Sequence, residues 1–346
     1  MDKSLPRPGV DQEGRDIVVI GGSSGAIEPL RSLIATMPAD IPAAIFVVIH
    51  TTETAPYLLP SVLQKDTELQ FATVEDKAPV SYGRIYLARP NLHLLLEDDH
   101  IRVVFGPKEN RMRPAIDALF RSAAWARRDR VIGILLSGGL DDGVAGLWDI
   151  RCCGGATMVQ EPSSAAFPDL IHNALNTMQV DYVADPEEMS EIVQRLATTT
   201  PDGDQDVSHE QDRIKLENEI EIEPDDHHAR LQQIGTVSGY TCPGCRGPLW
   251  RLGNGALDRY RCRVGHAYSG NILFQACWEA SEQNLYSALQ LLEENARVGN
   301  QIIRKNDKNN KLASSELVDQ VRRLEKEADI LRNLLYERTL GRTELA

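Results

Sequence analysis

A serine near the start of the chain lies in a glycine-rich turn, where its hydroxyl could act as a nucleophile. The pattern Gly21-x-Ser23-x-Gly25 matches the elbow of serine hydrolases, in which glycines permit a strained turn that exposes the serine oxygen. The same turn could instead hold a phosphate or nucleotide through its backbone N–H groups, although a complete G-x-G-x-x-G is absent. The motif leaves both interpretations open until a base and an orienting acid are found.

His50 and Asp142 supply a base and an acid. Each follows a run of apolar residues typical of a buried strand, and parallel strands bring their carboxyl ends to one edge of a sheet. A serine is a weak nucleophile unless an aligned imidazole removes its proton, and a carboxylate fixes the imidazole tautomer. Ser23, His50 and Asp142 therefore form a candidate triad, with Asp141 as the rival acid. Weaker candidates for the base are His93, His100 and His172, followed by His209, His227 and His228 in an acidic stretch.

The elements that must position these side chains alternate along residues 16–196. Apolar strand-like runs and amphipathic helical runs follow one another, which is typical of a parallel sheet covered by helices on both faces. The predicted fold class is α/β, with a doubly wound, mostly parallel sheet. A turn at Glu97-Asp98-Asp99 predicts a hairpin over 94–101, so part of the sheet is expected to be antiparallel. The expected strands are 17–20, 44–49, 84–87, 101–105, 131–136, 157–159 and 182–184.

Length, charge and hydropathy restrict the class of protein. The 346 residues suffice for about two domains, and the 42% hydrophobic content supports at least one sizeable core. A net charge of -14 argues against general nucleic-acid binding. Neither end carries an apolar segment of transmembrane length, and residues 1–14 lack a signal-peptide core. A cytoplasmic protein without membrane insertion is expected.

A strongly acidic stretch follows the predicted sheet. Residues 200–236 contain eleven Asp or Glu against three Lys or Arg, which accounts for over half of the net charge of the chain. Charge runs usually keep a segment solvated, so a flexible linker is expected over 201–212. Residues 214–216 and 220–222 alternate between apolar and charged side chains in the manner of short edge strands.

Three cysteines and a histidine form two close pairs with the spacing of a metal site. Cys242-x-x-Cys245 is followed, after sixteen residues, by Cys262-x-x-x-His266, and this ligand set suits tetrahedral zinc. Four protein ligands leave no position for water, so the predicted zinc is structural, and a module this small would need it to fold. No cofactor is expected for catalysis. The remaining cysteines are assigned no chemistry: Cys152, Cys153 and Cys277.

Two amphipathic helices are predicted in the last part of the chain. Apolar residues recur with 4-3-4 spacing from Leu285 to Ala296 and again from Leu317 to Leu335. The polar residues 305–311 separate the two runs, so the helices either fold back as a hairpin or pair between subunits as a coiled coil. We expect this region to recruit a regulator or to mediate self-association.

Further motifs accompany the candidate triad. They are Ile20-Gly21-Gly22-Ser23-Ser24-Gly25, the strand ending in His50, Gly106-Pro107 with Arg113-Pro114 and Asp117-x-Leu119-Phe120, Ser137-Gly138 with Asp142-Gly143-x-x-Gly146, and Gln160-Glu161-Pro162. On these motifs residues 15–197 resemble the catalytic domain of chemotaxis methylesterases of the CheB family. The order Ser, His, Asp also differs from that of ordinary α/β-hydrolases. The resemblance implies a Rossmann-like methylesterase fold, with Ser23 as nucleophile, His50 as base and Asp142 as orienting acid.

The resemblance also implies a substrate and a mechanism. The implied reaction is hydrolysis of glutamate methyl esters on methyl-accepting chemoreceptors through an acyl-enzyme, with deamidation of receptor glutamine as a second activity. Backbone N–H groups of Ser24, Gly25 and Gly139 are candidates to stabilise the oxyanion. Gly139 stands where the family usually has a larger residue, and residues 51–54 depart from the usual Met-Pro start. These departures leave room for an esterase or amidase acting on a different substrate; a catalytically weak signalling module is the other alternative.

The expected organisation has five parts. They are a tail over 1–14, the methylesterase domain over 15–197, an acidic linker over 198–238, a zinc module over 239–270 and helices over 271–346. The zinc module resembles an extension found after the catalytic domain in some methylesterases of this family, through motifs such as Tyr240-Thr241-Cys242-Pro243 and Leu249-Trp250. Family members commonly carry an amino-terminal phosphorylation receiver domain. About fifteen residues before the first strand are too few for one, so none is expected.

Overall fold

The computed structural model describes residues 14–201, 208–222, 227–252, 257–308 and 315–343. The chain divides into two compact units, Met1–Leu273 and Phe274–Ala346. The tail expected over 1–14 lies outside the described residues, apart from Gly14. In the described parts of the chain, no helix combines the length and apolar character needed to cross a membrane.

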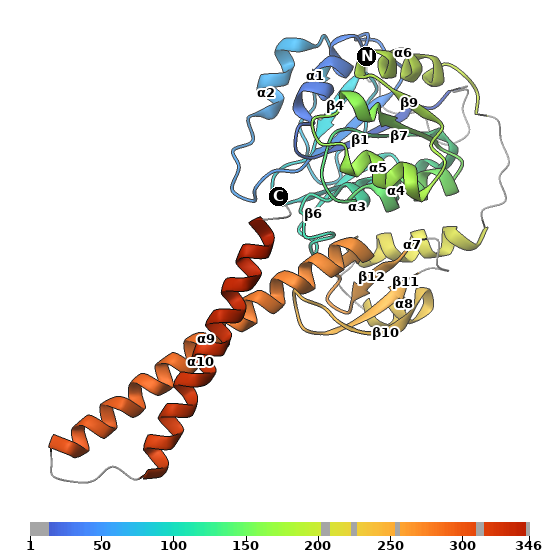
Figure 1. The fold of residues 1–346 in the computed structure, drawn as a ribbon. Helices are drawn as coiled ribbons and strands as arrows, with labels where there is room; N and C mark the ends of the chain where they lie inside the picture. The colour runs from blue at the N-terminus through green and yellow to red at the C-terminus, as the bar shows by residue number, and fades with distance from the viewer. Residues whose placement is uncertain (1–13, 202–207, 223–226, 253–256, 309–314, 344–346) are drawn as a thin grey trace. The chain divides into compact units, whose positions relative to one another are not determined.

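Seven parallel strands form the central sheet of the first unit (Figure 1). Their order is β3-β4-β2-β1-β7-β8-β9, and each pair of neighbours is parallel. The central strand β1 is buried along its whole length, which explains its unbroken run of apolar side chains. The strands are β1 (Ile17–Gly22), β2 (Ala44–Ile49), β3 (Gln70–Phe71), β4 (Arg84–Leu87), β7 (Val131–Leu135), β8 (Ala156–Gln160) and β9 (Tyr182–Ala184).

Helices cover both faces of this sheet, which confirms the predicted doubly wound α/β class. One apolar core lies between the sheet and α1, α2 and α6, and the other lies between the sheet and α3, α4 and α5. Alternate residues of β1 point into opposite cores: Val18 into one and Val19 into the other. The helices are α1 (Ile27–Ala35), α2 (Leu59–Leu63), α3 (Ile116–Arg127), α4 (Val144–Cys152), α5 (Asp169–Thr177) and α6 (Pro186–Ala197), with short 3-10 turns at Gln64–Asp66, Arg128–Arg130 and Pro162–Ser164.

The hairpin predicted around residues 97–99 is present, but it is not part of the central sheet. Strands β5 (His93–Glu97) and β6 (His100–Val104) pair antiparallel and form a separate two-stranded sheet. Apolar side chains of β5 and β6 pack into the core beside α3, so the hairpin covers one face of the central sheet instead of extending its edge. The expectation of an antiparallel part within the main sheet is wrong.

The acidic stretch differs most from the sequence-based expectation. Residues expected as edge strands lie instead in helix α7 (Ser208–Ile222), which is followed by α8 (His227–Ile234). Ile214 and Ile220 are buried, and so are the charged side chains of Glu217 and Glu221. Over 213–222 the expectation of a solvated segment is wrong, because arginines of β12 bond to these buried side chains: Arg259 to Glu217 and Arg261 to Glu221. Residues 202–207 of the expected linker lie outside the described part of the chain.

A small antiparallel sheet contains the cysteine cluster. Its order is β10-β11-β12-β13, with each strand next to its sequence neighbour. Trp250 and Leu252 of this sheet pack against Ile220 and Leu231 of the two preceding helices. The strands are β10 (Gly235–Thr241), β11 (Pro248–Leu252), β12 (Arg259–Cys262) and β13 (Ala267–Ser269).

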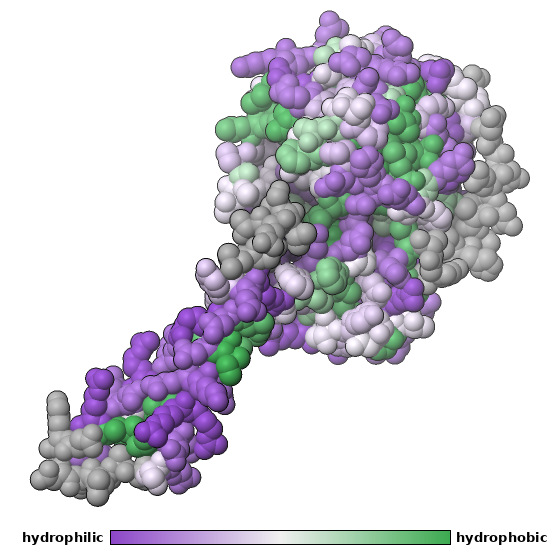
Figure 2. Space-filling model, in the orientation of Figure 1, coloured by the Kyte–Doolittle hydropathy of each residue, from purple (hydrophilic) through white to green (hydrophobic). Residues whose placement is uncertain are grey.

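The second unit is a helical hairpin built from α9 (Gly270–Lys308) and α10 (Ser315–Thr343) (Figure 1). The most buried apolar positions fall on the predicted 4-3-4 spacing, and Asn300 donates to Glu325 across the pair at 2.9 Å. The hairpin is thus the arrangement adopted by this chain. Its visible surface is mainly hydrophilic, with some hydrophobic side chains between the charged ones (Figure 2). The buried positions are Ala296, Val321, Ala328 and Leu335.

Candidate active site

Ser23 lies in a tight turn that connects the central strand β1 to helix α1. Its backbone N–H donates to the carbonyl of Ser137 beyond β7 (3.0 Å), and its carbonyl accepts the N–H of Ala26 (3.1 Å). Gly25 has a φ of +75°, and a Cβ there would lie 2.8 Å from Oγ of Ser137. The turn therefore needs glycine at position 25, and it holds Ser23 partly exposed at the carboxyl edge of the sheet.

His50 follows the end of β2, the neighbour of β1 in the sheet. The parallel register pairs Gly22 with Ile49, and the N–H of His50 donates to the carbonyl of Gly22 at 3.1 Å. Only 9% of the His50 side chain is exposed. Because the two strands run parallel and end together, the residues that follow them, Ser23 and His50, lie at the same edge.

The carboxylate of Asp142 accepts four hydrogen bonds. Nε2 of His50 donates to Oδ2 at 2.7 Å, and Nδ2 of Asn110 donates to Oδ1 at 2.8 Å. The first two N–H groups of α3, those of Ile116 and Asp117, donate at 2.7 and 3.3 Å. These donors and the positive end of the helix dipole offset the burial of a side chain that is only 3% exposed.

Asp141, the rival acid, has different partners. Its carboxylate accepts Oγ–H of Ser269 at 2.7 Å and Nδ2–H of Asn271 at 3.2 Å. Burial raises the pKa of Asp141 above its ordinary value. Among the described residues, Asp142 is the carboxylate that bonds to His50. Asp141 instead ties the same loop to Ser269 at the end of β13 and to Asn271 at the start of α9.

A third aspartate lies directly behind Asp142. Asp117 accepts the N–H groups of Gly143 and Gly146 at 3.0 and 2.6 Å, and Nδ2 of Asn110 donates to it at 2.7 Å. Burial, together with the nearby charge of Asp142, raises the pKa of Asp117 well above its usual range. Asp117 therefore shapes the loop that carries Asp142 and does not itself contact His50.

The ring of His50 has one nitrogen left for the serine. Nε2 is bonded to Asp142, so Nδ1 is the nitrogen that could accept the Ser23 proton. No hydrogen bond joins the Ser23 hydroxyl to this ring within the described residues. Such contacts commonly tighten when substrate binds.

Donors for an oxyanion are available close to Ser23. Across the ranges that the structure describes, the N–H groups of Ser24, Gly25 and Gly139 have no hydrogen-bond partner, whereas the N–H of Gly138 donates to Phe167 at 2.9 Å. A Cβ at Gly138 would lie 3.1 Å from Cβ of Ser23, so this loop passes next to the serine. A Cβ at Gly139 would meet nothing within 4 Å, which leaves open space in front of that residue.

The weaker histidine candidates lie in other surroundings. His93 is completely buried, with Nε2 bonded to the carbonyl of Pro107 (2.8 Å) and Nδ1 accepting the N–H of Ala115 (3.2 Å). Burial lowers the pKa of His93. His100 pairs with Asp99 on the exposed hairpin turn, at 2.6 Å. Neither of these two histidines has a serine among its hydrogen-bond partners.

Cys242, Cys245, Cys262 and His266 come together at one end of the small sheet. Their ligand atoms all lie within 4.8 Å of one another. Sγ of Cys245 is 3.6 Å from Sγ of Cys262, and Nδ1 of His266 is 3.8 and 3.6 Å from Sγ of Cys242 and Cys262. Tetrahedral zinc with bonds of about 2.0 to 2.3 Å requires ligand separations of about 3.5 to 3.8 Å. The donor set and its spacing fit a metal ion.

Asn110 is the residue of this site that the sequence did not single out. It stands inside the Gly106 to Asp117 stretch, and its φ of +49° places it in the left-handed region that Asn tolerates. A lone asparagine in a loop belongs to no periodic pattern and to no metal-ligand motif, so no such pattern marks it. Its only signal was its position between two of the motifs that carried the resemblance.

Comparison with known proteins identifies the family. A model of the CheB methylesterase family matches residues 18–193, which is half of the chain and contains Ser23, His50 and Asp142. The chain belongs to the CheB methylesterase family. A CheB-family relative from Leptospira interrogans is 32% identical over 182 residues, and the alignment covers 52% of this chain and 94% of the relative.

Two further comparisons each cover about half of the chain. The protein-glutamate methylesterase/protein-glutamine glutaminase 1 of Geobacter metallireducens is 34% identical over 177 residues, 50% of this chain and 48% of that protein. The crystal structure of the Thermotoga maritima CheB methylesterase catalytic domain aligns with a TM-score of 0.49 and 26% identity, covering 52% of this chain and 98% of that one. The Geobacter metallireducens alignment, at 177 residues, is too short to span both residues 18–193 and the cysteine cluster.

Proposed function

We propose that this CheB-family protein is a protein-glutamate methylesterase, with Ser23 as nucleophile, His50 as general base and Asp142 as orienting acid. The observation that carries the assignment is the 2.7 Å hydrogen bond from His50 to Asp142 at the sheet edge where the Ser23 turn also lies. A nucleophile beside a base that a third group orients is the arrangement on which acyl transfer to serine depends.

The proposed reaction proceeds in two steps. Oγ of Ser23 attacks the carbonyl carbon of a glutamate methyl ester while Nδ1 of His50 takes the hydroxyl proton. The C–O bond to the methoxy group then breaks, and the protonated His50 returns the proton so that methanol leaves. Water attacks the acyl-enzyme with His50 again as base, which frees Ser23 and leaves a glutamate carboxylate.

Charge that develops on the carbonyl oxygen needs fixed donors. The free N–H groups of Ser24, Gly25 and Gly139 are the candidates, because they lie on the two loops that meet at Ser23. Deamidation of glutamine follows the same steps, with ammonia as the leaving group. No step requires a bound cofactor.

The substrates we propose are the methylated cytoplasmic segments of methyl-accepting chemoreceptors, so the proposed location is the cytoplasm. The test is methanol release from a peptide that contains glutamate γ-methyl ester, with wild type and Ser23→Ala compared. Hydrolysis that depends on Ser23 would support the assignment. Equal release by the variant would refute it, and reaction of Ser23 with a fluorophosphonate without methanol release would point to a different ester or amide.

We further propose that the cysteine cluster holds a structural zinc ion. Four protein ligands fill a tetrahedral shell, and the ion would link the turn after β10 to the turn between β12 and β13. The role proposed for the α9–α10 hairpin is self-association or docking of a regulator. Light scattering of the full chain distinguishes a dimer from a monomer that awaits another partner.

A further inference from the structure

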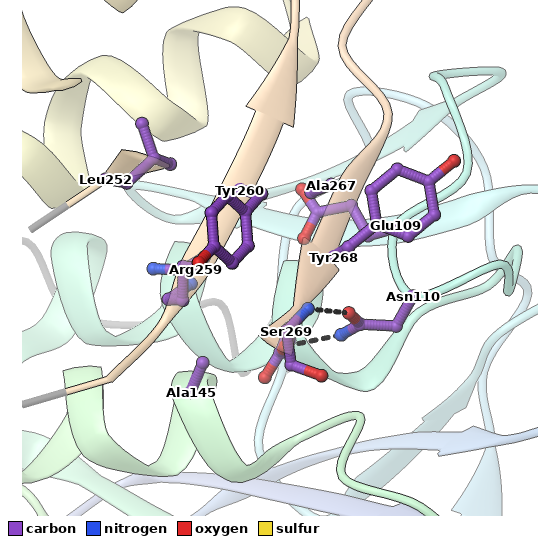
Figure 3. Close-up of a pocket in the computed structure, with 10 residues that line it drawn as sticks. Glu109, Asn110, Ala145, Leu252, Arg259, Tyr260, Ala267, Tyr268 and Ser269 are labelled. Atoms are coloured by element: carbon purple, nitrogen blue, oxygen red, sulfur yellow. Dashed lines mark hydrogen bonds between the residues drawn. The ribbon is translucent and has the colours of Figure 1, made fainter. Parts of the chain in front are cut away.

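Asn110 connects the cysteine-histidine module, which is the small sheet β10–β13 with its cysteine cluster, to Asp142, the proposed acid. Its side-chain N–H groups donate to Oδ2 of Asp117 (2.7 Å) and Oδ1 of Asp142 (2.8 Å), while its Oδ1 accepts the N–H of Ser269 at 3.0 Å. Figure 3 shows Asn110 facing Ser269 at the end of β13. Because the backbone N–H of Ser269 can only donate, it must face Oδ1 of Asn110, and this determines the orientation of the amide. Asn110 as a whole is only 4% exposed, so bulk water does not replace these partners.

The backbone around Asn110 is also attached to the module. The N–H of Asn110 donates to the carbonyl of Ala267 (2.8 Å), and Glu109 forms a parallel bridge with Ala267. From the same strand, Oγ of Ser269 donates to Asp141, the residue before Asp142. Strand β13 therefore holds the acid-bearing loop on two sides, through Asn110 and through Asp141.

Buried charges keep the module in this position. Arg261 on β12 is completely buried and bonds to Glu109 and to Glu221 of α7, the latter at 2.6 Å. Glu109 in turn pairs with the buried Arg121 of α3 at 2.5 and 2.9 Å. Separating one member of such a cluster from its partners leaves an uncompensated buried charge. The module is therefore held in one position against α3 and α7.

The contacting residues are neighbours of the metal ligands. Arg261 precedes Cys262 and Ala267 follows His266, and the N–H of Cys262 donates to the carbonyl of His266 at 2.9 Å. An ion bound by Cys262 and His266 would fix this β12–β13 turn from its tip. The same turn presents Arg261, Ala267 and Ser269 to the catalytic domain.

We propose that Asn110 is a positioning residue through which the cysteine-histidine module, on binding its metal, holds the Asp142 carboxylate against His50. This inference rests on the proposed triad. It assigns the module a direct part in the geometry of the proposed active site, in addition to its own folding.

The first test replaces Asn110. Asn110→Ala frees the Asp142 carboxylate from the position in which it faces His50, so the protonated imidazole is stabilised less, and the midpoint of the His50 titration, followed by NMR of the imidazole, should fall by at least about 0.5 pH unit. Methanol release should fall about 10- to 100-fold in kcat/KM for Asn110→Ala.

Asn218→Ala is the matched control. Asn218 is a buried amide in the same interface, where it bonds to Arg121 and has no contact with Asp142. Its loss should lower thermal stability and leave the His50 midpoint in place. A folded Asn110→Ala protein with the wild-type His50 midpoint would overturn the proposal.

The second test removes the metal. Treating the zinc-loaded full chain with a chelator should lower the His50 midpoint in wild type and have little further effect in Asn110→Ala, since both changes act through one link. Amide hydrogen exchange should quicken in residues 105–117 and 137–146 as well as in the module. Faster exchange confined to 239–269, with His50 unmoved, would overturn the proposal.

The NMR readout separates this inference from the function on which it rests. If no hydrolysis depends on Ser23, the proposed methylesterase fails, but the effect of Asn110 on His50 is still measured. If Ser23-dependent hydrolysis is present and Asn110→Ala matches wild type in rate and midpoint, the function stands and the positioning role fails.

Discussion

Nε2 of His50 donates to Oδ2 of Asp142 at 2.7 Å, across 92 residues of sequence. The bond joins the end of β2 to the loop after β7, and both strands flank β1, which leads to Ser23. The three side chains of the proposed triad thus come from three adjacent strands of one parallel sheet. Sheet order, more than any local motif, brings them to one place.

Ser23→Ala should abolish methanol release from a glutamate methyl ester peptide, with a loss of about 10⁴-fold or more in kcat, because no other group forms the acyl-enzyme. Ser24→Ala is the matched control, since the neighbouring side chain is exposed and Ser24 enters the mechanism only through its backbone N–H. Substantial turnover by Ser23→Ala would refute the covalent mechanism.

Asp142→Asn and Asp141→Asn should differ sharply in activity. The amide at 142 cannot accept from His50 as a carboxylate does, and we expect a loss of about 10³- to 10⁴-fold in kcat. Asp141→Asn keeps the His50 bond and should cost no more than about tenfold, through its contacts with Ser269 and Asn271. Steady-state kinetics on the same ester peptide measures both, and the reverse ranking would make Asp141 the acid.

Purified protein should contain one zinc per chain, measurable by native mass spectrometry. Cys245→Ser should lose the ion and lower the melting temperature, because the small sheet has only a limited apolar core of its own. Cys277→Ser serves as the control, since Cys277 is exposed and lies outside the cluster. Full zinc content in Cys245→Ser would contradict the predicted ligand set.

Glu221 should make stability depend on pH. Burial, reinforced by Glu109, raises the pKa of Glu221 from 4.5 to about 8. Between these values the unfolded chain releases the proton and the folded chain keeps it, so the free energy of unfolding falls as pH rises. In wild type, Glu221 should account for a fall of a few kcal/mol in the free energy of unfolding over that pH range. Urea unfolding of Glu221→Gln should show this part of the fall to be missing.

Glu217 should have the opposite effect on the pH dependence of stability, measured in the same way. Burial alone would raise the pKa of Glu217, but Arg259, Arg213 and other arginines lower it to about 2. This carboxylate therefore contributes stability above about pH 4.5, and the contribution is lost as pH falls through about 2. Glu217→Gln should destabilise the protein at neutral pH. For Glu221, the contradicting result would be a Glu221→Gln protein whose free energy of unfolding depends on pH as in wild type.

Gly299→Leu should destabilise the helical hairpin. A Cβ at Gly299 would lie 2.3 Å from Cγ2 of Val321 on the facing helix, so the two helices would have to separate. We expect a loss of about 1 to 3 kcal/mol in the unfolding of this unit, followed by circular dichroism. Val298→Leu, at a site that is 55% exposed, should have little effect.

The parts of the fold that follow from local pattern could be predicted from sequence. The strands ending at Ile49, Leu87 and Ala184 have the predicted bounds, because each is an apolar run closed by polar or turn residues. Sheet order then brings Ser23 and His50 to one edge. The cysteine-histidine cluster was equally local in its signal, since two close pairs of residues supply all four of its members.

The rest depended on partners that are remote in sequence. Helix α7 looked like a solvated segment because two of the arginines that bond to its buried glutamates, Arg259 and Arg261, are remote in sequence. Arg261 and Glu109 are 152 residues apart, and no periodicity connects them. Asn110 was overlooked for the same reason, because its role depends on hydrogen bonds to Asp117, Asp142 and Ser269.

The buried arginine and glutamate cluster has a consequence for how the module can be separated from the catalytic domain. Mobile ions screen charges that face water, but they do so only weakly where the solvent is excluded, as it is around Arg121 and Arg261. High ionic strength, which weakens most associations based on charge, should therefore leave this contact closed. Proton uptake by Glu109 and Glu217, whose pKa values their arginine partners lower despite burial, is the condition that opens it.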